Sequence, residues 1–289
     1  MKKSKRNDED KHSIDELFQR SLKFKNTKEY LDFFRFIGKI LHYSHYNATL
    51  VYMQNQNVKY FGTPGYWKKE FKRKVKPDAR PYVIIVPFGP AALAYDVYET
   101  EGDVSPDEFI NAGFRGELFK VYGDLPEELL REIINNLAEY KVFVRHKHFR
   151  FNKAGETFND EKGTINIDIT NELNTAQKFS TLIHELAHNF LGHLGNNELI
   201  KETVITKGTD KGKKKQEKIV IEGRTVSSDM QEIEAETVAF LICSRWNLEN
   251  NPYEYLSYHL TEENIKQISV ETIINVADEI ERKFLAKFR

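Results

Sequence analysis

The segment from Asn174 to Gly195 constrains the fold of this chain more than any other part of its sequence. Its apolar residues recur at the 3.6-residue period of an α-helix, at positions 179, 183, 186, 187, 190 and 194. Asn174 and Gln177 have the spacing of an N-terminal capping box, and Gly195 suits the end of the helix. The sequence therefore predicts a long amphipathic helix with one face in a core.

Two histidines on this helix are spaced to bind one metal ion. His184 and His188 are four residues apart, one helical turn, so both imidazoles can reach a single ion at about 2 Å. Glu185 lies beside them, where it can accept a proton from an attacking water. The alternative, two ordinary histidines and a glutamate, would be costly to bury in such an apolar segment. We predict a zinc site with Glu185 as its catalytic base.

A catalytic zinc site usually has three protein ligands, and the helix predicted near residues 231–239 offers the third. Glu232 and Glu236 share one stripe of this helix with Ala235 and Ala239. The alanines permit close approach of another helix, and two buried carboxylates one turn apart favour a cation. We assign Glu232 as the third ligand and Glu236 as acceptor for the second N–H of a ligand histidine. The alternative is a solvent-exposed acidic face near a helix N-terminus.

Two residues near this constellation have other expected roles. A third histidine ligand on the first helix would need glycine at 191 and histidine at 194, whereas the chain has Gly192 and His193. We therefore expect His193 to pack or form hydrogen bonds. Glu234 lies on nearly the opposite face of its helix from Glu232, and we expect it to be exposed.

The distribution of charge divides the chain into two parts. Residues 1–100 carry 19 Lys and Arg against 11 Asp and Glu, and the remainder carries 24 against 33. We place the boundary near Gly123–Asp124, which gives domains 1–123 and 124–289. The first combines helices with two strands at 82–86 and 94–98. The second is mainly helical, with a small sheet and a hairpin; its strands are expected at 142–151 and 164–169, and its hairpin at 201–225. The predicted fold class is α+β.

Cysteine usage and hydropathy restrict the cellular context. The single cysteine, Cys243, excludes an internal disulfide framework and a cysteine-rich metal site, which fits a reducing compartment. The chain has neither the run of about 18 apolar residues that a membrane span requires nor a recognisable signal peptide. We expect a cytoplasmic protein without a membrane partner.

Residues 59–80 interleave aromatic and basic side chains. This pattern suits single-stranded nucleic acid, because bases stack on aromatic rings while cations follow the phosphates. An alternative remains open, in which the aromatic residues form a core and the lysines are solvated. The candidate contacts are Trp67, Lys68, Lys69, Lys72, Arg73, Lys74 and Lys76.

Motifs in both parts resemble known families. Residues 163–188, followed by Glu232-x-x-Ala235-Glu236-x-x-Ala239, resemble the zincin domain of ImmA/IrrE-type metallopeptidases and of ArdC-type antirestriction proteins. An ordered series in the first part resembles the ArdC-type single-stranded-DNA-binding domain; it comprises Tyr43-Ser44-x-x-Asn47, Gln54, Gly65-x-Trp67-x-Lys69, Ile84-Ile85-Val86-Pro87 and Asp96-Val97-x-x-Thr100.

The resemblance implies a gluzincin-like HExxH zinc metallopeptidase domain coupled to a domain that binds single-stranded DNA. The implied function is antirestriction or cleavage of an unidentified protein near DNA. Two alternatives stay open. One is a non-catalytic DNA-shielding protein with structural zinc, and the other is a protease that cleaves a repressor and whose first domain contacts protein.

Overall fold

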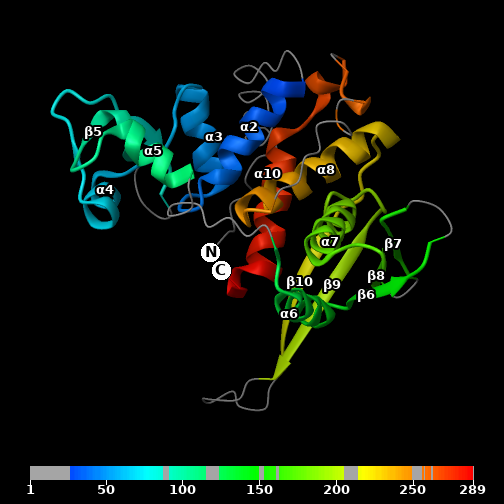
Figure 1. Cartoon of the computed structure of the whole chain (residues 1–289). Coiled ribbons are helices and arrows are strands. Elements are labelled where there is room, and N and C mark those ends of the chain that lie inside the picture. The colour runs from blue at the N-terminus through cyan, green and yellow to red at the C-terminus, as the bar shows by residue number, and fades with distance from the viewer. Residues whose placement is uncertain are drawn as a thin grey trace, which may run out of the picture. The chain divides into compact units, whose positions relative to one another are not determined.

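The computed structural model describes residues 27–86, 91–114, 124–149, 153–160, 163–204, 214–248, 256, 258–261 and 263–288. The chain forms two compact units, labelled by element in Figure 1. The first comprises Met1–Val121 and Ser244–Asn247, and the second Tyr122–Cys243 and Leu248–Arg289. The predicted boundary after residue 123 adjoins residues 115–123, which lie outside the described residues. Both units combine helices with small sheets, so the fold class is α+β as predicted.

The described part of the first unit, from Thr27 onward, starts with two helices and continues with short strands and turns. Its helices are α2 (Thr27–Lys39), α3 (His45–Gln54), α4 (Pro64–Phe71) and α5 (Pro106–Phe114). One antiparallel sheet has the order β1-β4-β3, formed by Phe61–Gly62, Ala92–Asp96 and Tyr82–Ile84. A second pairs β2 (Lys74–Val75) with β5 (Thr100–Glu101).

The strand β4 ends two residues earlier than the predicted strand 94–98. Asp96 causes this early end, because its carboxylate accepts hydrogen bonds from the backbone N–H of Tyr98 at 2.9 Å and of Lys59 at 3.0 Å. The chain consequently turns into the short 3₁₀ helix η1 (Val97–Glu99). The hydrogen bond to the Asp96 side chain thus favours a helical turn over continuation of the strand.

Two side-chain amides of α3 cover the outer edge of β3. The amide of Asn47 bonds both backbone groups of Ile85 at 2.8 and 2.9 Å, and that of Gln54 bonds both groups of Val83 at 2.9 and 2.8 Å. Asn47 and Gln54 are seven residues apart, so they lie on one face of the helix. Their pairing satisfies backbone groups that an edge strand would otherwise expose. These two residues of the ArdC-like series therefore have structural roles.

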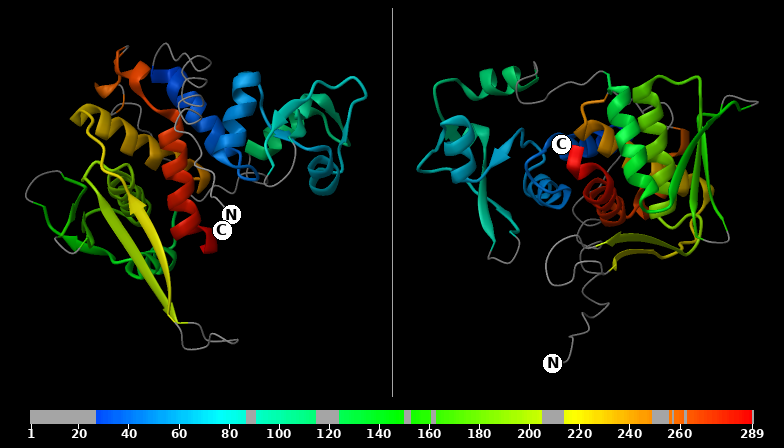
Figure 2. Two further views of the ribbon diagram at one scale, coloured as in Figure 1. Left: turned by 180° about the vertical axis from the view of Figure 1, so that it is seen from behind. Right: turned by 90° about the horizontal axis from the view of Figure 1, so that it is seen from below.

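The second unit carries a three-stranded sheet with α7 packed against it (Figures 1 and 2). The sheet order is β6-β8-β7, formed by Val142–Lys147, Ile165–Thr170 and Gly155–Asn159. The central strand β8 is parallel to β6 and antiparallel to β7. The predicted strand 142–151 ends early at Lys147, and β7 was not predicted, because Gly155–Asn159 lacks an alternating apolar pattern.

Helices and a hairpin complete the second unit. The hairpin pairs β9 (Asn197–Val204) with β10 (Lys214–Ile221), close to the predicted 201–225. The α-helices are α6 (Glu127–Ala138), α7 (Thr175–Phe190), α8 (Ser228–Arg245) and α10 (Val270–Ile280). Shorter helical segments are the 3₁₀ helices η2 (Asn264–Gln267) and η4 (Ala286–Phe288) and the π-helix η3 (Glu281–Leu285). Within the residues described, we find no helix that is both long and apolar enough to cross a membrane.

Candidate metal centre

The helix α7 positions the candidate site from a well-anchored start. Asn174 accepts from the backbone N–H of Gln177 at 2.9 Å, and the Gln177 side chain accepts from that of Asn174 at 3.0 Å, so the predicted capping box is present. The apolar stripe is buried, with Phe179, Leu182 and Ile183 fully covered, and α7 packs against β7, β8, α6 and α10. Since this stripe fixes the rotation of the helix, the two histidines project from the opposite side.

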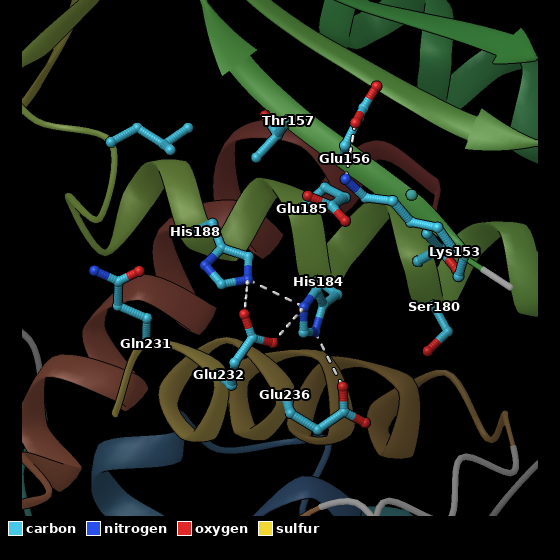
Figure 3. Close-up of a pocket in the computed structure, with 14 residues that line it drawn as sticks. Lys153, Glu156, Thr157, Ser180, His184, Glu185, His188, Gln231, Glu232 and Glu236 are labelled. Carbon is cyan, nitrogen blue, oxygen red and sulfur yellow. Dashed lines mark hydrogen bonds and ion pairs between the residues drawn. The ribbon is translucent and has the colours of Figure 1, made fainter. Parts of the chain in front are cut away.

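His184 and His188 face the helix α8 and point their ring nitrogens at one place (Figure 3). Their Nε2 atoms are 3.1 Å apart. Glu232 lies opposite, with its carboxylate oxygens 3.5 Å from His184 Nε2 and 3.6 Å from His188 Nε2. The structure thus brings together the three predicted ligands. Two imidazole nitrogens and a carboxylate converging this closely form an arrangement that a cation stabilises.

Glu236 fixes the orientation of the first histidine. One turn after Glu232 on α8, its carboxylate lies 3.0 Å from Nδ1 of His184. Since a carboxylate only accepts, His184 Nδ1 carries the donated proton, and Nε2 is the nitrogen left to face a metal ion. This is the arrangement that the sequence predicted for Glu236.

His188 contacts a second imidazole, that of His193, rather than a carboxylate. The prediction for the neighbouring Glu234 is wrong. Glu234, expected to be exposed, is only 1% exposed, and its carboxylate lies 3.0 Å from His193 Nε2 and 2.9 Å from Arg224. His193 in turn contacts His188, Nδ1 to Nδ1, at 3.0 Å, which is the hydrogen-bonding role expected of it. A charged side chain can be buried when charged partners surround it, and no local pattern around Glu234 indicates that Arg224 is such a partner.

The surroundings shift the pKa values of the two histidines in opposite directions. Burial lowers the pKa of His184, but the carboxylates of Glu232 and Glu236 outweigh this and raise it to about 10. Burial, reinforced by the neighbouring His184, lowers the pKa of His188 to about 4. For Glu234 burial raises the pKa, yet hydrogen bonds from His193 and Arg224 bring it below its usual value.

Glu185 is buried beside the histidines and lines the same cavity. Burial raises the pKa of its carboxyl group to about 7, although the neighbouring His184 opposes the shift. The strand β7 passes closely over it. A Cβ atom added at Gly155 would lie 2.6 Å from Thr181 Cγ2 and 3.1 Å from a Glu185 oxygen. Glycine at this position therefore allows the strand to lie against α7.

The cavity in front of the histidines has a volume of about 570 Å³. The helices α7 and α8 form two of its walls, and residues 153–157, including the first half of β7, form a third (Figure 3). Asn189 of α7 donates to Thr157 Oγ1 at 2.6 Å, which ties β7 to the helix. Among the strands that the structure describes, β7 pairs only with β8, so no described strand pairs with its other edge.

The residues proposed for nucleic-acid contact divide into two groups, and for two of them the prediction is wrong. Trp67 is fully buried and donates its indole N–H to the backbone oxygen of Tyr95 at 3.0 Å, so it cannot stack on bases. Arg73 is 2% exposed and donates to Thr100 Oγ1 and to the Val104 backbone oxygen, both at 2.8 Å. Both side chains satisfy structural partners instead.

The lysines of this segment remain at the surface. Lys68, Lys69, Lys72 and Lys74 are exposed. Lys76 is half-buried and donates to the backbone oxygen of Tyr98 at 2.8 Å. Side chains of this kind can reach phosphates, so four of the seven candidates are placed for electrostatic contact.

The chain is similar to a solved structure, although its sequence matches no known family. No family model matches the chain, and no curated protein does. Among solved structures, the chain is similar to the Mn(II)-bound crystal structure of the antirestriction protein ArdC from plasmid R388, with 13% identity, 86% of each chain covered and a TM-score of 0.44. At this level of similarity, no property of that protein is transferred to this chain.

Proposed function

We propose that the second unit is a zinc-dependent peptidase in which His184, His188 and Glu232 hold the metal. The observation that supports this most directly is the convergence of these three side chains beside a buried carboxylate, Glu185, in one open cavity. Two imidazoles and a carboxylate are a common ligand set of catalytic zinc. Each histidine also has its Nδ1 bonded outward, which leaves Nε2 for the metal.

Zinc in such a place supplies Lewis acidity, which acidifies water and polarises a carbonyl oxygen. The protein supplies the proton acceptor. With a pKa near 7, Glu185 is suited to take a proton from water at neutral pH and to return it to a leaving amine. A purely structural metal site needs no such group, which favours an enzyme over the non-catalytic alternative.

The edge of β7 with which no described strand pairs favours a polypeptide as substrate. An extended peptide can pair with an exposed strand edge through main-chain hydrogen bonds, and this edge belongs to a strand that lines the cavity. A peptide held there would lie across the face of α7 that carries Glu185. The substrate class that fits is therefore an extended segment of protein.

The experiment that tests this proposal replaces Glu185. We expect Glu185→Gln to bind zinc as the parent does, measured by metal analysis of the full chain, and to lose at least about 100-fold in hydrolysis of a randomised quenched-fluorescent peptide library. Glu128→Gln, at an exposed carboxylate of α6 that does not line the cavity, is the matched control and should retain most activity. If the zinc-loaded parent cleaves no peptide, the result favours the alternative of a non-catalytic protein with structural zinc.

We also propose that the first unit binds single-stranded DNA through phosphate contacts. The supporting observation is the group of four exposed lysines at the end of α4 and in β2, Lys68, Lys69, Lys72 and Lys74. Such a unit would hold the peptidase near DNA-bound proteins, which suits a role in antirestriction. Stacking by Trp67 is not part of the proposal.

Salt dependence tests the DNA proposal. We expect a labelled oligonucleotide to bind the full chain with an affinity that falls steeply as salt increases, because phosphate contacts release counterions. The double variant Lys72→Glu and Lys74→Glu should weaken binding for every sequence tried. Reversal of Lys215, an exposed lysine of the second unit, serves as the control. Absence of binding at low salt would favour the alternative that the first unit contacts protein.

A further inference from the structure

A hydrogen-bonded series of side chains leads from Arg224 to His188 in the second unit. Arg224 donates to both carboxylate oxygens of Glu234, each at 2.9 Å. Glu234 lies 3.0 Å from His193 Nε2, and His193 Nδ1 lies 3.0 Å from His188 Nδ1. The side chains of His193 and Glu234 are 0% and 1% exposed, so water does not compete for these bonds.

The donor and acceptor of each hydrogen bond in this series follow from the charge of Glu234 and Arg224. Paired with the guanidinium of Arg224 through two bonds, Glu234 is a carboxylate and can only accept. His193 Nε2 therefore donates to it, and in neutral His193 the other nitrogen, Nδ1, has a lone pair. Between the two Nδ1 atoms, His188 must then be the donor. Its remaining nitrogen, Nε2, carries a lone pair and faces Glu232.

The backbone around this series holds its members in place. Gly192 adopts a φ of +75°, and a Cβ atom there would lie 2.1 Å from the backbone oxygen of Glu222. Only glycine fits this close approach. Its carbonyl oxygen accepts from the backbone N–H of Arg224 at 2.9 Å, and the N–H of His193 donates to His188 at 3.0 Å. The turn after α7 is thus joined to the segment that supplies the arginine.

We propose that Arg224, Glu234 and His193 form a relay that positions His188 and fixes its proton on Nδ1, so that Nε2 is always available to the metal. This inference rests on the proposed metal site. The relay makes the two ligand histidines unequal, since His184 bonds a carboxylate directly and His188 reaches one only through a second imidazole. His193 and Glu234 are positioning residues, because they act through His188.

The test compares zinc affinities of full-length variants against a competing chelator. His193→Phe removes the acceptor for His188 and should weaken zinc binding about 10- to 100-fold. His193→Asn can keep a neutral acceptor near His188 but cannot reach Glu234, so its loss should be smaller. Glu234→Gln removes the charge and leaves the imidazole, so its loss should be similar to that of His193→Asn.

Combined variants separate a relay from a general structural role. Once His193→Asn has cut the relay, adding Glu234→Gln should cause little further loss of zinc affinity. By contrast, Glu234→Gln and Glu236→Gln act on different histidines, so their losses should multiply. In the zinc-loaded parent, long-range ¹H–¹⁵N spectra should show the His188 proton on Nδ1. Thermal unfolding of each metal-free variant controls for folding.

Different results overturn different statements. If the parent binds no zinc, the proposed function fails and the relay with it. If the parent binds zinc and His193→Phe binds it equally well, only the relay fails. The relay also fails if Glu234→Gln weakens binding as much in the His193→Asn background as in the parent, because Glu234 would then act by another route.

Discussion

The candidate metal centre of the second unit and the basic segment of the first unit differ in how well their side-chain positions could be predicted from the sequence. In the second unit, the histidines of α7 and two carboxylates of α8 meet as their spacing indicates. In the segment 67–76, by contrast, two of seven candidate residues turn inward. The difference teaches that a long amphipathic helix fixes the direction of its polar side chains, whereas short elements leave that direction to distant packing partners.

The structure of the basic segment shows what those distant partners are. The ring of Trp67 lies 5.8 Å from Tyr60 and 5.7 Å from Phe109, both outside α4. Arg73 lies over the ring of Phe109 at 5.5 Å. Neither partner is close enough in sequence for helical periodicity to reveal it, and α4 has only 8 residues.

Loss of the metal is the largest effect that we expect, and it tests the second-unit side of the comparison. His184→Ala and His188→Ala should each abolish zinc retention after dialysis, and Glu232→Ala should do the same, because each removes one of three ligands. Glu236→Ala should only weaken affinity, by about 10- to 100-fold. The assignment breaks if Glu236→Ala loses zinc completely while Glu232→Ala keeps one zinc per chain.

Replacement of Trp67 gives the next largest effect and tests the first-unit side. We expect Trp67→Ala to lower the free energy of unfolding of this unit by about 3 to 5 kcal/mol, as truncation of a buried tryptophan does. Chemical denaturation followed by circular dichroism measures this. Trp67→Phe, which keeps a ring but loses the bond to Tyr95, should cost less. A stable Trp67→Ala variant with weakened DNA binding would contradict the burial and restore the stacking interpretation.

The pair Arg73 and Lys72 provides the finest comparison, since the two cations are adjacent in sequence. Arg73→Ala leaves the Thr100 hydroxyl and the Val104 carbonyl without their donor, so we expect a loss of about 2 to 3 kcal/mol in unfolding free energy. Lys72→Ala should change stability by less than about 0.5 kcal/mol, because the side chain is exposed. Oligonucleotide affinity should show the opposite order. Equal losses of unfolding free energy for Arg73→Ala and Lys72→Ala would contradict the structural role of the buried Arg73 side chain.

Part of the fold and the centre of the site could be predicted because their signals are local. The capping box of α7 joins residues three apart, and His184 and His188 are one turn apart. Glu232 and Glu236 lie on one stripe of α8 for the same reason. Neighbours along a helix have a fixed geometry, so their relative positions need no knowledge of the rest of the chain.

The tertiary structure alone decided which other polar groups are buried and which face is open. The burial of Glu234 could not be predicted because its partner His193 is 41 residues away in sequence. The strand β7 could not be predicted because it lacks an alternating apolar pattern and is defined by its backbone pairing with β8. Burial of a charge depends on partners that the fold delivers from elsewhere, and the residue itself carries no mark of them. The sequence by itself determined which residues converge at the proposed metal site, and the fold determined the groups that hold them there.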